Sequence, residues 1–80
     1  MSEKQVLAAR KLNVDGFTLT FAAGMKAGYP VVVFGIFTKD ENIPLLTIEK
    51  DCPSPAQAMN YVNAVTDVAG RKLLEYYQVT

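Results

Sequence analysis

The sequence predicts one small α+β domain, in which an antiparallel β-meander of three or four strands packs on one long C-terminal helix. Three observations favour this fold. Apolar and β-branched runs separated by glycine-containing turns fill residues 12–50, as in a meander. Apolar residues recur at a helical period after residue 54. The chain has 80 residues, half of them hydrophobic and only a fifth charged, which suits a single folded domain spanning 1–80.

The clearest local signal is the pair Asp15-Gly16 between two alternating segments. Asp-Gly suits a two-residue hairpin turn, because both central positions need a positive φ. If Val14 faces Phe17 across this turn, the flanking residues fall into two faces. The predicted core face holds Leu12, Val14, Phe17, Leu19 and Phe21, and the opposite face holds Thr18, Thr20 and Ala22.

The segment before this hairpin is ambiguous. Residues 3–11 are rich in helix formers, and Ser2 with Gln5 resembles a capping box. A strand here would place Arg10 on the core face. We nevertheless favour a strand, because the hairpin needs a partner, and therefore the order ββββα over αβββα.

The remaining strands follow from composition and turns. Residues 24–28 contain two glycines and are interpreted as the second turn, and residues 29–38 form the strongest strand, apolar on both faces as in a central strand. Residues 39–42 are interpreted as a polar turn. Residues 45–50 return as the last strand, and Pro44 places that strand at an edge of the sheet.

The C-terminal helix has a clear start. Ser54 is the predicted N-cap, Pro55 suits the first helical position, and Gln57 completes a capping box. The helix is expected to continue to about Tyr77. Gly70 lies in its interior, where glycine disfavours helix, so a weak point or a close packing contact is expected there. The predicted buried stripe is Ala58, Met59, Val62, Val65, Ala69, Leu73 and Tyr76.

Counting faces suggests an interaction surface. Val31, Val33, Phe37, Leu46 and Ile48 are expected to share the core face with the first hairpin, under the helix. The other face would then expose an apolar patch, and such patches usually mark an interface. The predicted partner-binding residues are Val32, Phe34, Ile36 and Leu45, with Tyr77 at the end of the helix. A helix at residues 3–11 folded over this face is the alternative.

No catalytic, metal-binding or cofactor-binding residue is predicted. The chain has no histidine and one cysteine, which argues against a zinc site and excludes Ser-His and Cys-His pairs. The glycines form no phosphate-binding motif, and the carboxylates suggest no catalytic pair. Cys52 precedes the helix start, where a thiol can be activated, but an ordinary cysteine is the favoured interpretation. We therefore expect a protein that is not an enzyme.

The favoured function is a non-catalytic protein–protein interaction module, with a homodimer as the expected assembly. A small viral or mobile-element accessory or inhibitor protein is one form of such a module. The alternative is a single-stranded nucleic-acid-binding protein that uses Phe34 and Tyr29 on the open sheet face. Eight acidic and eight basic residues cancel, which disfavours duplex nucleic acid as a partner. No signal peptide or membrane span is predicted, and the expected location is cytoplasmic.

Overall fold

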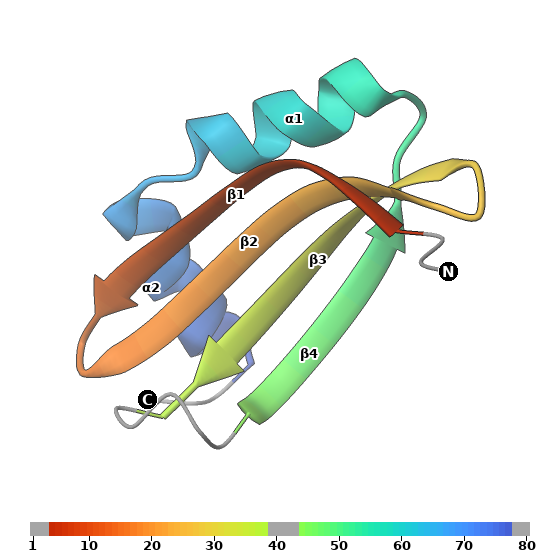
Figure 1. Cartoon of the computed structure of the whole chain (residues 1–80). Helices are drawn as coiled ribbons and strands as arrows, with labels where there is room; N and C mark the ends of the chain where they lie inside the picture. Colours follow the sequence, from red (N-terminus) through yellow and green to blue (C-terminus); the bar gives the residue numbers. More distant parts are fainter. Residues whose placement is uncertain (1–3, 39–43, 78–80) are drawn as a thin grey trace.

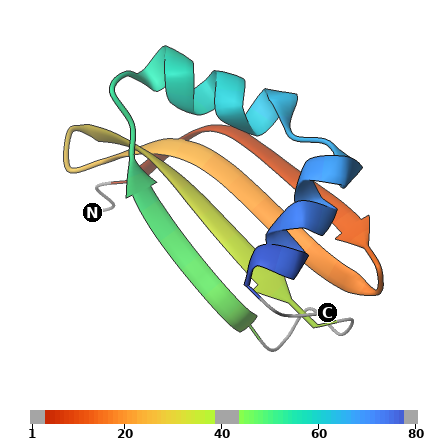
Figure 2. The ribbon, with the colours of Figure 1, turned by 180° about the vertical axis from the view of Figure 1, so that it is seen from behind.

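The computed structural model describes residues 4–38 and 44–77. A four-stranded antiparallel sheet with the order β1-β2-β3-β4 is followed by two helices on one of its faces (Figures 1 and 2). The elements are β1 (Lys4–Val14), β2 (Phe17–Lys26), β3 (Tyr29–Phe37), β4 (Pro44–Asp51), α1 (Pro55–Ala64) and α2 (Asp67–Tyr76). The α+β meander and the strands-first order are confirmed, whereas the single long helix is wrong. The polar turn predicted at 39–42 lies outside the described residues.

The first hairpin has the predicted register. Asp15 and Gly16 adopt φ of 51° and 86°, and Val14 lies opposite Phe17. Arg10 lies opposite Phe21, as the alternation required. Residues 4–14 form one strand, so the alternative of an N-terminal helix is wrong.

The second hairpin differs from the prediction. Its turn is only Ala27-Gly28, with φ of 51° and 87°, so Lys26 lies opposite Tyr29. A two-residue turn pairs odd-numbered residues of β2 with even-numbered residues of β3, and paired residues share a face. Phe21 therefore lies opposite Phe34. The prediction that Val31, Val33 and Phe37 face the core is wrong, since the even-numbered residues of β3 do so instead.

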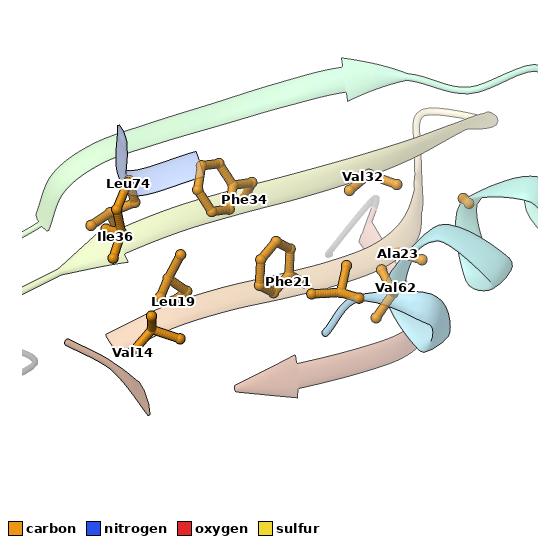
Figure 3. Packing of buried hydrophobic residues seen from close by; sticks show 11 residues of the cluster. Val14, Leu19, Phe21, Ala23, Val32, Phe34, Ile36, Val62 and Leu74 are labelled. Atoms are coloured by element: carbon orange, nitrogen blue, oxygen red, sulfur yellow. The ribbon is translucent and has the colours of Figure 1, made fainter. Parts of the chain in front are cut away.

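The hydrophobic core lies between the sheet and the two helices. The Phe21 and Phe34 rings stack with centroids 5.1 Å apart at its centre, and Figure 3 shows Leu74 of α2 beside Ile36. Val62 of α1 belongs to the same buried cluster. These side chains come from β2, β3 and both helices, so the core depends on the register of the second hairpin. The buried cluster contains Val14, Leu19, Phe21, Ala23, Val32, Phe34, Ile36, Ala58, Val62, Val65 and Leu74.

The break between α1 and α2 has a local cause. Val65 is extended, with φ −65° and ψ 135°, and Thr66 is the N-cap of α2, accepting a 3.3 Å hydrogen bond from the Ala69 N–H. The predicted N-cap of α1 is confirmed, since the Ser54 side chain accepts a hydrogen bond from the Gln57 N–H. A β-branched pair with a capping threonine thus stops one helix and starts another.

The break shifts which residues of the second helix are buried. Leu74 and Gly70 face the sheet, while Tyr76 is exposed. A β-carbon at Gly70 would lie 3.3 Å from the Cγ2 atom of Val14, which confirms the predicted close contact. The expected weak point is absent from Gly70, because the interruption falls at Val65 and Thr66.

Arg10 lies on the core face of β1, and its hydrogen bonds explain why a charged residue is tolerated there. Its guanidinium donates hydrogen bonds to the carbonyl oxygens of Asn63, at 3.1 Å, and Val65. These carbonyls lie at the C-terminal end of α1, where backbone acceptors lack helical partners and positive charge is favoured. Arg10 therefore fastens the junction between the helices to the first strand.

We expect Arg10→Met to destabilise the fold by ~1.5–3 kcal/mol, the usual contribution of hydrogen bonds to a charged group. The methionine retains much of the aliphatic bulk but leaves the two carbonyls without their donor. Urea unfolding followed by circular dichroism measures the effect. Arg71→Met is the matched control, because Arg71 makes only an exposed 3.3 Å ion pair with Asp15, worth at most ~1 kcal/mol. Equal losses for the two variants would contradict this role of Arg10.

Candidate functional site

The structure separates the residues predicted to form a partner-binding patch. Val32, Phe34 and Ile36 are at most 6% exposed and lie under the helices. Leu45 is 46% exposed at the edge of the sheet. Tyr77 is half-buried and packs on Phe34, with ring centroids 6.2 Å apart. The prediction that an apolar patch around Phe34 is uncovered is therefore wrong, for the same reason that the face assignment of β3 was wrong.

The sheet face without helices carries small and polar side chains as well as valines. At Gly35, a β-carbon would lie 2.9 Å from both the Phe37 ring and the Thr20 hydroxyl oxygen, so these groups cover the glycine. Val31 is only 5% exposed. Tyr29 is 67% exposed at the end of β3. Phe34 lies in the core, so Tyr29 is the one of the two aromatic residues named by the nucleic-acid hypothesis that this face carries.

Lys26 and Glu49 form an ion pair on the open face. The Lys26 ammonium is 2.8 Å from Oε1 of Glu49, and both residues border a hollow of about 220 Å³ over Val31 and Val33. The hydrogen bond from Lys26 to Glu49 and the charge of that carboxylate raise the pKa of Lys26 above its ordinary value. Both groups are partly exposed, so this pair makes at most a small contribution to stability.

A larger apolar groove lies on the opposite side of the molecule, between the two helices. Its volume is about 510 Å³, and nearly all of its surface is apolar. Tyr61 and Tyr76 stand at its margins with 50% and 76% of their surface exposed. The groove exists because the break at Val65 turns α2 away from the axis of α1 (Figure 2). Its lining residues are Tyr61, Ala64, Val65, Ala69, Lys72, Leu73 and Tyr76.

A smaller crevice of about 290 Å³ adjoins this groove and extends toward β4. Tyr61 and Leu73 line both hollows, so the apolar surface continues from the helices to the margin of the sheet. Cys52 lies in the crevice as a half-buried free thiol, and its backbone N–H donates to the carbonyl oxygen of Pro30 at 2.9 Å. No cluster of three potential metal ligands occurs among the residues the structure describes.

Sequence reasoning missed most of this groove. It placed Tyr76 in the buried stripe of a single helix and assigned no role to Tyr61. In the structure, Tyr76 is instead 76% exposed. The available signal was Thr66 followed by Asp67, a second N-cap with an acidic first-turn residue, which favours a new helix start.

No family model matches the chain, and neither a curated protein nor a solved structure is significantly similar to it. In the ranges 4–38 and 44–77, no helix has the length and hydrophobicity needed to cross a membrane.

Proposed function

We propose that this chain is a non-catalytic protein-binding module that holds a short amphipathic helix of a larger partner in the groove between α1 and α2. The observation that carries the proposal is the apolar groove flanked by the exposed rings of Tyr61 and Tyr76. Contiguous exposed apolar surface usually marks an interaction site, and tyrosine is enriched among residues that dominate binding energy.

The dimensions of the groove favour a short amphipathic helix as its occupant. Each wall is a helix of 10 residues, which corresponds to a length of ~15 Å, or about three helical turns of a partner. Such helices bind grooves through apolar residues spaced three and four positions apart. Among the described residues of the lining, Lys72 is the charged one, so a partner helix with an acidic residue at its margin complements this site.

A small-molecule ligand fits this groove less well. Ligand sites in proteins enclose most of the ligand and use a few converging polar groups to orient it. This groove is wide open to solvent, and its lining offers almost no polar surface. The absence of histidine from the sequence further supports a non-catalytic role.

Cys52 is the single cysteine of the chain and is unpaired. We therefore place the module in the cytoplasm, where thiols remain reduced. A small inhibitor from a virus or mobile element can act by occupying a partner's helix in this way, and so can a subunit of a larger assembly.

The proposal predicts that Tyr76→Ser and Tyr61→Ser each weaken partner binding ~30-fold or more, as expected for residues that dominate an interface. Wild-type protein serves as bait to isolate a stoichiometric partner, and the affinities of all variants for that purified partner are then measured by calorimetry. Tyr29→Ser is the matched control, because Tyr29 is as exposed as the groove tyrosines but lies on the open sheet face. It should leave the affinity within about threefold of wild type.

Two results would contradict this function. One is a partner that binds the Tyr76→Ser variant and the wild type equally well. The other is binding of single-stranded oligonucleotides that weakens steeply with salt and is lost in Tyr29→Ser, which would support the nucleic-acid alternative instead.

A further inference from the structure

The sheet has two edge strands, and the helices protect only one of them. α1 packs across β1, β2 and β3, and α2 packs on β1. Figure 2 shows β4 outside both helices. The β1 edge is further modified by a register shift between Val6 and Ala8 and by the attachment of Arg10 to α1. Bulges and covering elements are the usual means by which edge strands avoid pairing with other chains. Within residues 4–38 and 44–77, β4 is therefore the accessible edge.

The backbone of β4 offers unpaired hydrogen-bonding groups at this edge. The Cys52 N–H donates to the carbonyl oxygen of Pro30 in β3. Antiparallel strands alternate between residues that bond to the neighbouring strand and residues that do not. Every second residue before Cys52, that is Lys50 and Ile48, therefore hydrogen-bonds to β3. The backbone N–H and C=O groups of the residues between them, Thr47 and Glu49, point away from the sheet.

Apolar side chains accompany these backbone groups. Leu46 and Ile48 lie opposite Ile36 and Phe34, on the helix face, and are only partly buried at the margin of the core. Leu45 is 46% exposed at the register shift where β4 begins. The same edge therefore combines unpaired amides with apolar side chains that the helices leave partly open to solvent.

A second copy of the chain complements this edge. A two-fold axis perpendicular to the sheet pairs two β4 strands antiparallel and keeps all helices on one side, where neither helix obstructs the approach to β4 (Figure 2). Opposed side chains must share a face, so only registers that pair residues of the same parity are allowed.

The charges of β4 select among the allowed registers. Centring the axis on Glu49 places two carboxylates directly opposite each other, which is destabilising. Centring it on Ile48 places Leu46 opposite Lys50 of the second copy. It also leaves the two Glu49 carboxylates as diagonal neighbours. Centring it on Thr47 pairs Leu46 with Ile48 of the second copy twice and places no like charges opposite. The last register also pairs the outward N–H and C=O groups of the two Thr47 residues.

We propose that two copies of this chain form a dimer through their β4 edges, with Thr47 opposite Thr47 of the second copy, to give one continuous eight-stranded sheet. Leu46 and Ile48 of both copies then pair across the two-fold axis on the helix face. The dimer leaves the groove between α1 and α2 accessible, so it does not depend on the occupant proposed for that groove.

Solution mass tests the dimer. Wild-type protein at tens of micromolar should have twice the monomer mass of 8.8 kDa by light scattering. Thr47→Pro should remain folded and become monomeric, because proline is tolerated on an edge strand whose N–H faces solvent but cannot donate to a second strand. Ala9→Pro makes the equivalent change at an exposed, outward-directed position of β1 and should leave the dimer intact. A monomeric wild type, or a dimer unchanged by Thr47→Pro, overturns the proposal.

Cross-linking tests the register without relying on the proline variant. In a Cys52→Ser background, Thr47→Cys should form a covalent dimer under mild oxidation, because hydrogen-bonded opposed residues have Cα atoms ~5.5 Å apart, within disulfide range. Leu46→Cys and Ile48→Cys have no matching cysteine opposite and should cross-link at least tenfold more slowly. Equal rates for the three variants, or fastest cross-linking by Ile48→Cys, overturn the proposal.

Discussion

Replacing Phe21 by alanine is expected to destabilise the fold by ~3–5 kcal/mol, the usual cost of removing a buried aromatic ring. Phe21 is 1% exposed and stacks on Phe34 (Figure 3), within the buried cluster that also contains Val62 of α1. A domain of 80 residues has a total stability of roughly 4–12 kcal/mol, so the loss is a large fraction of it. Urea unfolding monitored by circular dichroism should show a much lower midpoint or no folded baseline.

Tyr29→Ala is the matched control for this prediction. It removes a ring of similar size from β3, but 67% of Tyr29 is exposed, so we expect a change within about 0.5 kcal/mol. Comparable losses for Phe21→Ala and Tyr29→Ala would mean that the stack of Phe21 on Phe34 is not the centre of the core.

Gly24→Ala is expected to destabilise the protein by ~1–3 kcal/mol, as overpacking usually does. A β-carbon at Gly24 would lie 2.5 Å from the backbone carbonyl oxygen of Gln5 in β1, and a backbone atom in a paired strand cannot move aside easily. The expected sign is opposite to the usual one, since glycine within a strand is normally less stable than alanine by roughly 0.5–1 kcal/mol. Thermal unfolding should show a midpoint about 4–8 °C lower for each kcal/mol lost.

Ala22→Val tests whether this effect belongs to Gly24 or to any enlargement on the open face of β2. Ala22 borders the hollow on that face, and valine favours strands, so this variant should be as stable as the wild type or slightly more so. A stable Gly24→Ala variant would indicate that β1 can move away from β2 near Gln5 at little cost.

The first hairpin was predictable because its turn uses residues that favour positive φ. Asp15-Gly16 fixed the register of β1 and β2, and the pairing of Arg10 with Phe21 followed from it. The second turn was not recognised, because alanine rarely adopts the φ of 51° that Ala27 has. Interpreting residues 24–28 as a longer loop assigned the odd-numbered residues of β3 to the core face, whereas the even-numbered residues lie there. One unrecognised turn residue therefore moved the predicted interaction surface to the wrong side of the sheet.

The groove was less predictable than the strands. Its shape depends on the angle between α1 and α2, and periodicity within each helix does not report that angle. The buried residues of α1, Ala58 and Val62, match the predicted stripe, because they precede the break. Beyond Val65 the predicted set of buried residues is wrong, because one extended residue changes the direction in which every later side chain points. Leu74 was consequently missed and Tyr76 was misplaced.

The packing of α2 on β1 has a consequence for synthesis of the protein. Among the described elements, the last in chain order, α2, covers part of the first, β1, and Leu74 closes the core over Ile36 (Figure 3). A nascent chain that has emerged only as far as β4 contains the complete sheet, but the apolar face with Phe21 and Phe34 is still exposed to solvent. Such intermediates are prone to aggregate. We therefore expect ribosome-bound chains of this length to recruit chaperones, and to release them once the final turn of α2 has left the exit tunnel.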